Sequence, residues 1–102
     1  MMPDTIQLDK TIHEQARLKI LVLLASSPQG TVSFTEIRKK LEMTAGNLSI
    51  QLKTLEEAGF VELEKRIKGK KPVTDATLTA TGKQALLEYI SSLENLLSHV
   101  IE

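Results

Sequence analysis

The sequence contains no cysteine and no tryptophan, has only three aromatic residues, and carries a formal net charge of zero. Without cysteine, the protein has no disulfides, no thiolate metal sites and no cysteine redox sensor. Because Phe34, Phe60 and Tyr89 are the only aromatic side chains, the core must be aliphatic. No apolar run approaches the roughly 18 residues of a membrane helix, and the start of the chain lacks the basic-then-apolar form of a signal peptide. We therefore expect a soluble, cytoplasmic protein with no membrane partner.

The usual arrangements of catalytic and metal-binding residues are missing as well. The sequence has no Ser/His/Asp arrangement, no glycine-rich phosphate loop and no paired carboxylates in an apolar stretch. His99 and Glu102 are close in sequence, but zinc and nickel sites need three or four ligands. His13 has no ligand-like neighbour in the sequence, so we interpret it as a structural residue. We therefore expect a protein that is not an enzyme and that has no metal or cofactor.

The chain has 102 residues, enough for one domain of ordinary size, and its charge is unevenly distributed. Residues 34–71 contain nine Lys or Arg and six acidic residues, a net charge of +3, which leaves −3 for the remainder. We expect one basic end and one acidic end, a distribution that matters more for nucleic-acid binding than the sum does. A domain of this size buries only about two-thirds of its unfolded surface, so self-association would help to stabilise it.

Two helices joined by a tight turn are predicted between residues 33 and 59. Ser33 and Glu36 have the spacing of a capping box at the start of the first helix, and Thr44 can cap the second. The second helix carries one apolar stripe, formed by Leu48, Leu52 and Leu55. It ends at Gly59.

The opposite face of the second helix is short, polar and nearly uncharged. It is formed by Gly46, Asn47, Ser49, Ile50, Lys53, Thr54 and Glu57. Asn and Ser side chains can hydrogen-bond base edges, an exposed isoleucine can contact a thymine methyl, and the glycine lets another backbone come close. A helix that presents its first turns in this way suits the DNA major groove. The alternative is a solvated face on an ordinary helical hairpin.

A β-hairpin with a basic tip is predicted directly after this helix. Residues 60–66 alternate between apolar and polar side chains, as a half-buried strand does, and residues 73–78 return as the second strand. The turn between them, residues 67–72, is rich in cations. The residues expected to lie along DNA phosphates are Arg66, Lys68, Gly69, Lys70 and Lys71. A run of charges is usually only a solvated loop, but its position straight after two such helices favours DNA contact.

A helix at each end of the chain flanks these elements. The first is expected from Asp9 or Thr11 to about Ser26, and the apolar run in its second half requires cover on more than one side. The last is expected from Ala80 onward, with Thr79 as its cap. Its apolar side chains follow a heptad seam formed by Leu86, Ile90, Leu93, Leu97 and Val100. The seam packs on its own domain or on a second copy, and we expect a dimer because the first helix already supplies apolar cover.

In this order of elements and in four short motifs, the sequence resembles small winged-helix transcriptional regulators of the MarR/ArsR-like group. The motifs are Phe34-Thr35-Glu36-Ile37, Thr44-Ala45-Gly46-Asn47-Leu48-Ser49, Leu52-Lys53-Thr54-Leu55-Glu56-Glu57-Ala58-Gly59-Phe60-Val61, and Leu78-Thr79 with Gly82 and Ala85-Leu86. The resemblance covers nearly the whole chain and implies an α+β winged helix-turn-helix with a two-stranded β wing and a long C-terminal dimerisation helix. We divide a single domain, residues 1–102, into an N-terminal helix (1–30), a helix-turn-helix (33–59), a wing (60–78) and a C-terminal helix (79–102).

The resemblance also implies a homodimer that binds double-stranded DNA. The residues that would fall on its DNA-reading helix are Thr44, Ala45, Gly46, Asn47, Ser49, Ile50 and Lys53. We expect a sequence-specific transcriptional regulator, a repressor rather than an activator, because so small a chain has room for little beyond occlusion. The alternatives are a protein-interaction module, which would not need five cations within residues 65–71, and a nonspecific chromatin-type DNA binder. No polar cluster in the sequence defines a site for a small-molecule effector.

Overall fold

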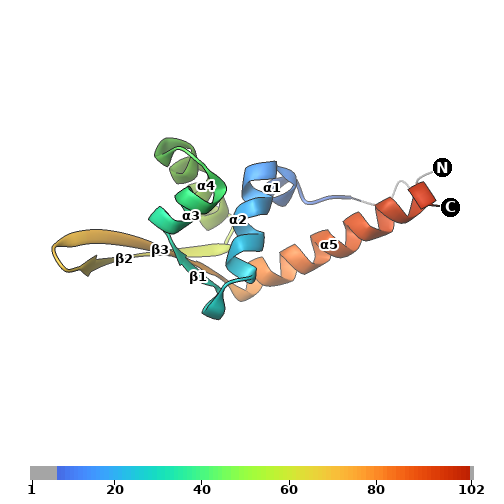
Figure 1. Ribbon diagram of the computed structural model, residues 1–102. Coiled ribbons are helices and arrows are strands. Elements are labelled where there is room, and N and C mark those ends of the chain that lie inside the picture. The colour runs from blue at the N-terminus through green and yellow to red at the C-terminus, as the bar shows by residue number, and fades with distance from the viewer. Residues whose placement is uncertain (1–6, 102) are drawn as a thin grey trace.

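The protein is elongated, with a β-hairpin projecting at one end and a long helix at the other (Figure 1). The computed structural model describes residues 7–101, so Glu102, considered above as a metal ligand, lies outside the described residues. The elements in chain order are α1 (Lys10–His13), α2 (Gln15–Ala25), a 3-10 turn (Pro28–Gly30), β1 (Thr31–Ser33), α3 (Phe34–Leu41), α4 (Ala45–Glu57), β2 (Val61–Lys68), β3 (Lys71–Leu78) and α5 (Ala80–Ile101). This is the α+β fold of a winged helix-turn-helix, as expected.

The core is aliphatic and is built around α2, which contacts α1, α3, α4, α5 and β3. Ile20, Leu21 and Leu24 of α2 are completely buried. The cover on several sides that the apolar sequence of this helix requires therefore comes from elements of the same protomer. Val22 remains 44 % exposed. Completely buried side chains from the other elements include Ile12, Ile37, Leu48 and Leu55.

The expected single N-terminal helix is wrong, because the chain breaks it into α1 and α2 at Glu14. The backbone of Glu14 is extended (φ −67°, ψ 130°), and its carboxylate accepts hydrogen bonds from the amides of Ala16 and Arg17 at 3.1 and 3.0 Å. Glu14 thus caps α2, while Asp9 caps α1 by accepting from the amides of Thr11 and Ile12. Glutamate is not among the preferred N-cap residues, so no local pattern signalled the break.

The caps predicted for the other helices are present. Ser33 Oγ accepts from the amide of Glu36 at 3.2 Å, and Thr44 Oγ1 accepts from the amide of Asn47 at 3.1 Å. The Glu36 carboxylate, expected to return a bond to Ser33, forms an ion pair with Lys40 instead (3.3 Å). These caps fix where α3 and α4 begin and therefore which side chains their first turns expose.

The sheet has three antiparallel strands in the order β1-β3-β2, one more than the hairpin expected from the sequence. Val32 of β1 pairs with Ala76 of β3, and both are buried, so the short strand fastens the hairpin to the core. The strands of the hairpin are longer than expected, and the turn shrinks from six residues to Gly69 and Lys70. Gly69 has φ +66°, which a two-residue hairpin turn requires at its first central position.

A tight joint connects α4, the hairpin and α5. Thr79 Oγ1 donates to the Gly59 carbonyl at 2.6 Å and accepts from the Gly82 amide at 2.9 Å, so it caps α5 as expected. The Thr79 amide donates to the Phe60 carbonyl at 3.0 Å. Gly82 is buried directly against that carbonyl, and a Cβ atom at this position would overlap the Phe60 oxygen. Only glycine permits this approach of α5 to the start of the hairpin.

Gly82→Ala is expected to lower the free energy of unfolding by about 3 kcal/mol, because a backbone oxygen cannot move aside as a flexible side chain would. Gly46→Ala is the matched control, since its new methyl group would meet no neighbour within 4 Å and the change improves helix propensity by up to about 1 kcal/mol. Urea unfolding of both variants checks the prediction. Equal stabilities for the two variants would contradict the close approach at Gly82.

The Glu14 cap predicts a pH dependence of stability. Burial alone raises the pKa of the Glu14 carboxyl, but hydrogen bonds from the amides of Ala16 and Arg17 and the charge of Arg17 outweigh it and hold this pKa below 4.5. A lowered folded-state pKa stabilises the protein above the unfolded value and stops doing so as the pH falls through the folded value. Glu14→Gln should therefore destabilise the protein at neutral pH and progressively less below pH 4.5. Because 39 % of the side chain is exposed, solvent screening limits the loss to less than about 1 kcal/mol.

Urea unfolding of wild type and Glu14→Gln across this pH range measures the difference. A difference that does not change with pH would mean that the charge of Glu14 contributes nothing to its capping.

Candidate nucleic-acid interface

Helix α4 turns its leucines inward and its polar side chains outward. Leu48, Leu52 and Leu55 are buried in the core, as the stripe predicted. All seven residues predicted for the reading face are exposed: Thr44, Ala45, Gly46, Asn47, Ser49, Ile50 and Lys53. The Ile50 side chain is 65 % exposed, which adds an apolar group to this face. The helix therefore presents a continuous, nearly uncharged surface along its first three turns.

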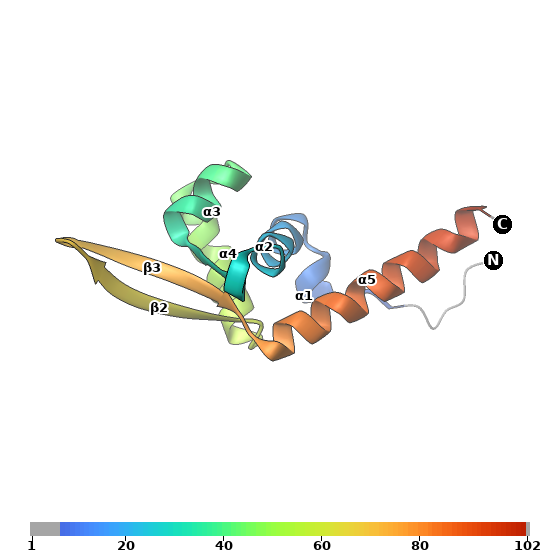
Figure 2. The same cartoon turned by 60° about the horizontal axis from the view of Figure 1, so that its bottom comes forward.

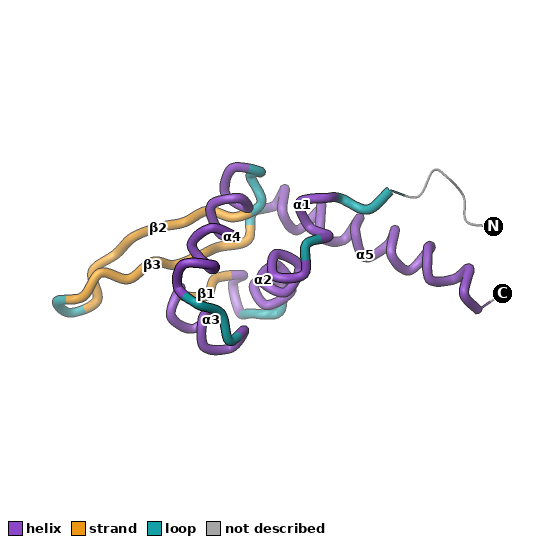
Figure 3. The backbone as a smooth tube through the Cα atoms, turned by 90° about the horizontal axis from the view of Figure 1, so that it is seen from above, coloured by secondary structure: helices purple, strands orange, loops and turns teal. Residues whose placement is uncertain are grey.

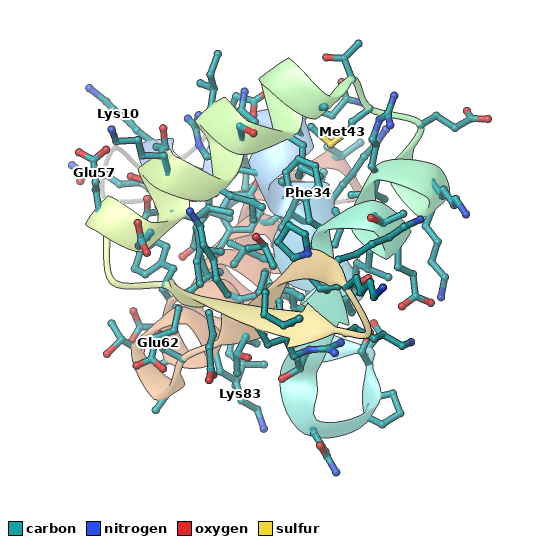
Figure 4. The ribbon with its side chains drawn as sticks, turned by 90° about the vertical axis from the view of Figure 1, so that its left-hand side faces the viewer. Lys10, Phe34, Met43, Glu57, Glu62 and Lys83 are labelled. Atoms are coloured by element: carbon teal, nitrogen blue, oxygen red, sulfur yellow. The ribbon has the colours of Figure 1, made fainter. Side chains whose placement is uncertain are left out.

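The turn before α4 sets the direction in which this helix leaves the core. Glu42 ends α3 in the left-handed conformation (φ 53°), and the next amide, that of Met43, donates to the Arg38 carbonyl at 3.1 Å. Met43 and Leu41 are half-buried against the core on either side of Glu42. Figure 4, viewed from the hairpin end, shows Met43 and Glu57 near opposite ends of α4, with the hairpin passing below the helix.

A row of hydrogen-bonded polar side chains connects α2 to the reading face of α4. Sequence reasoning missed it. Arg17 Nη1 donates to Gln51 Oε1 at 2.8 Å, and Gln51 Nε2 donates to Asn47 Oδ1 at 3.1 Å. The spacing of Asn47 and Gln51 by one helical turn was visible in the sequence. The contribution of Arg17 was not, because it comes from a separate helix. We call these three side chains the Arg17–Gln51–Asn47 relay.

The predicted wing residues gather at the far end of the hairpin. All five are exposed: Arg66, Lys68, Gly69, Lys70 and Lys71. Arg66 is already engaged, because its Nε lies 2.5 Å from Asp75 Oδ2 on the neighbouring strand. The hydrogen bond to Asp75 and the charge of that carboxylate raise the pKa of Arg66. Within residues 7–101, no ion pair holds Lys68, Lys70 or Lys71, so these three lysines carry the uncompensated charge of the tip.

The heptad seam on α5 has one part that is buried against the core of the same chain and one part that is exposed. Leu86 is only 3 % exposed and belongs to the core of its own chain, so its assignment to a dimer contact is corrected. Leu93 is half-buried against the same core. Ile90, Leu97 and Val100 are 38, 50 and 81 % exposed. Figure 2 shows the second half of α5 extending beyond the remaining helices.

The residues weighed for other kinds of site have structural surroundings. His13 has the structural surroundings expected of it, since its Nδ1 lies 2.9 Å from the hydroxyl of the buried Tyr89 and this contact ties α1 to α5. His99 is half-buried near the end of α5. In the part of the chain that the structure describes, no three His, Asp or Glu residues gather closely enough to hold a metal ion. No helix among residues 7–101 has the length and apolar character needed to cross a bilayer.

Comparisons with known proteins agree with this geometry. A family model described as the winged helix DNA-binding domain matches residues 16–97. An uncharacterised protein of Methanocaldococcus jannaschii is 34 % identical over 91 residues, which are 89 % of this chain and 97 % of that protein. A transcriptional regulator homologue from Pyrococcus horikoshii superposes with a TM-score of 0.79 at 28 % identity, covering 88 % of this chain and 87 % of that chain. Sco3205, a MarR family transcriptional regulator from Streptomyces coelicolor solved in complex with DNA, superposes with a TM-score of 0.73 at 25 % identity, over 91 % of this chain and 62 % of that chain.

The helix-turn-helix, the adjoining hairpin and the exposed face of α4 define a winged-helix DNA-binding protein. The chain belongs to the winged helix DNA-binding domain family, and it shares its fold with transcriptional regulators that include a MarR family member.

Proposed function

We propose that the protein is a homodimer that binds specific double-stranded DNA sequences and represses transcription by occluding its operator. The observation that carries this proposal is the exposed, nearly uncharged polar face of α4, which has the donors and acceptors needed to distinguish base pairs. In this proposal α4 enters the major groove, and the hairpin is the wing, whose tip lies along phosphates. Its relatives are archaeal and bacterial proteins, and the DNA of such cells lies in the cytoplasm. A cytoplasmic location is therefore part of the proposal.

The two alternative functions make less use of these surfaces. A protein-interaction module has no need for three lysines outside ion pairs at the tip of a hairpin. A nonspecific chromatin-type DNA binder would use those lysines but would have no use for Asn47 held in one orientation by other side chains. Sequence-specific binding uses both the face of α4 and the hairpin tip. A catalytic role forms no part of the proposal.

Exposed apolar side chains on α5 support the homodimer. Leu97 and Val100 lie on the half of α5 that extends away from the other helices, which Figure 3 shows from above. Together with Ile90 and the half-buried Leu93, they continue the heptad spacing that pairs two helices through one apolar stripe. A two-fold dimer would present two α4 helices to DNA, which predicts operator half-sites about 10 base pairs apart or a multiple of that spacing.

The first prediction from this proposal separates base reading from phosphate binding. Asn47→Ala should cost about 1–3 kcal/mol of binding free energy on the operator and relax the choice of base at one position, because a base-edge hydrogen bond is lost. It should leave binding to random DNA nearly unchanged. Lys70→Ala should weaken binding to operator and random DNA alike and lower the salt slope by about one for each wing that contacts DNA.

Titration of each variant against operator and scrambled duplexes at several salt concentrations measures both effects. If both variants keep the wild-type ratio of operator to random affinity, α4 does not read the sequence. The nonspecific chromatin-type function would then be the better description.

The second prediction concerns the dimer. Leu97→Glu should produce monomers, because a charge in an apolar helix–helix contact loses its hydration without gaining a partner. Leu97 is the better position than Leu93, which also packs on its own core. Ser91→Glu, an exposed position one residue beyond Ile90, is the matched control and should remain dimeric. Light scattering at micromolar concentration reports the masses, and a monomeric wild type under these conditions would exclude the proposed dimer.

A further inference from the structure

The Arg17–Gln51–Asn47 relay crosses from α2 to the face of α4 proposed to read DNA. The Arg17 side chain is only 18 % exposed and is held at three points. Its Nε donates to the Thr11 carbonyl at 2.5 Å, its Nη1 donates to Gln51 Oε1 at 2.8 Å, and the same nitrogen lies 3.9 Å from Glu14 Oε2. The guanidinium is therefore fixed relative to both helices before any DNA is bound.

The chemistry of arginine gives this relay a direction. A guanidinium has only hydrogen-bond donors, so the Gln51 atom that faces Arg17 must be the oxygen. The amide nitrogen of Gln51 is then the atom that faces Asn47, and an amide nitrogen only donates. The Asn47 atom that receives this bond must therefore be Oδ1, which turns the Nδ2 group of Asn47 away from Gln51.

An Asn–Gln pair one turn apart on an isolated helix has no such direction. Either amide can donate to the other, and the two arrangements differ little in energy because the groups are chemically alike. The cation on α2 removes this freedom by forbidding one of the two arrangements. A surface asparagine that would otherwise present its oxygen or its nitrogen equally well is left with one orientation.

We propose that Gln51, oriented by Arg17, is a specificity-determining positioning residue that makes Asn47 a hydrogen-bond donor toward DNA. This inference rests on the proposed function, in which Asn47 contacts a base edge. An outward Nδ2 group selects a base with a major-groove acceptor, foremost guanine with N7 and O6, and disfavours cytosine, which presents only the N4 donor. The relay thus determines which bases the reading face accepts, although Arg17 and Gln51 need not touch DNA.

Reversing the polarity of the middle residue tests this directly. In the Gln51→Glu variant the carboxylate can still accept hydrogen bonds from Arg17, but it has no donor to offer Asn47. The Asn47 amide must therefore flip, so that its nitrogen donates to the carboxylate and its oxygen turns outward. Binding of wild type and Gln51→Glu is measured on the operator selected from random duplexes, with each base pair replaced in turn by the other three. At the position that Asn47→Ala relaxes, Gln51→Glu should shift the ratio of affinities for guanine and cytosine by on the order of tenfold toward cytosine.

The double variant Asn47→Ala with Gln51→Glu is the control for the added negative charge. It should bind all duplexes more weakly but show the same ratio as Asn47→Ala alone, because the charge acts on phosphates without regard to sequence. If Asn47→Ala relaxes a position while Gln51→Glu keeps the wild-type preference there, the inference is wrong and the proposed function stands. If Asn47→Ala relaxes no position, Asn47 does not read a base, and both the reading assignment and this inference fail.

A second measurement needs no DNA. In the NMR spectrum of the free protein, the side-chain amide protons of Gln51 should exchange with water more slowly than those of Asn47, because only the former are hydrogen-bonded within the relay. In Gln51→Glu, the Asn47 protons should become the slowly exchanging pair. Arg17→Lys, which keeps a donor-only cation, should retain the wild-type pattern better than Arg17→Met. Protected Asn47 protons in the wild-type protein would overturn the assigned direction.

Discussion

The contact of Gly82 with the Phe60 carbonyl is the constraint on which the arrangement of the whole molecule depends. At this point the backbone of Phe60, which connects α4 to the hairpin, lies directly against the first turn of α5. Thr79 completes the joint by bonding the Gly59 carbonyl and the Gly82 amide with one hydroxyl. Because every bond of the joint involves backbone atoms, it fixes the angles between the three elements, and not merely their distances.

Affinity and specificity are carried by different parts of the molecule, each supported in its own way. The hairpin tip presents flexible lysines whose long-range attraction to phosphates tolerates imprecise positioning. The face of α4 needs fixed positions, because a hydrogen bond to a base edge is lost when a donor moves by about 1 Å or turns away. Accordingly, Asn47 is held by a neighbour, while Lys68, Lys70 and Lys71 are not paired within the described residues.

Local patterns in the sequence predicted most elements of the fold, but not the break at Glu14, the third strand or how the elements meet. The caps at Ser33 and Thr44 and the leucine stripe of α4 depend on residues a few positions apart, so they could be read directly. The predicted turn of residues 67–72 included Pro72, yet Pro72 lies within β3, at a level where β1 no longer pairs and its missing amide costs no ladder bond. Leu86 and the relay depend on contacts between distant helices. A heptad pattern cannot tell whether the cover for a leucine comes from the same chain or from another.

The correction at Leu86 changes the mechanics of the proposed dimer. With Leu86 enclosed by its own protomer, the apolar seam begins at Ile90 and runs outward, while the joint at Gly82 holds the other end of the helix. From Gly82 to Val100, α5 spans roughly 27 Å at about 1.5 Å per residue, so it acts as a rigid arm between the seam and the DNA-binding part. In the proposed dimer, the crossing angle of two such arms would set the separation of the two α4 helices. The operator spacing that the dimer recognises would then be determined by side chains that never approach DNA.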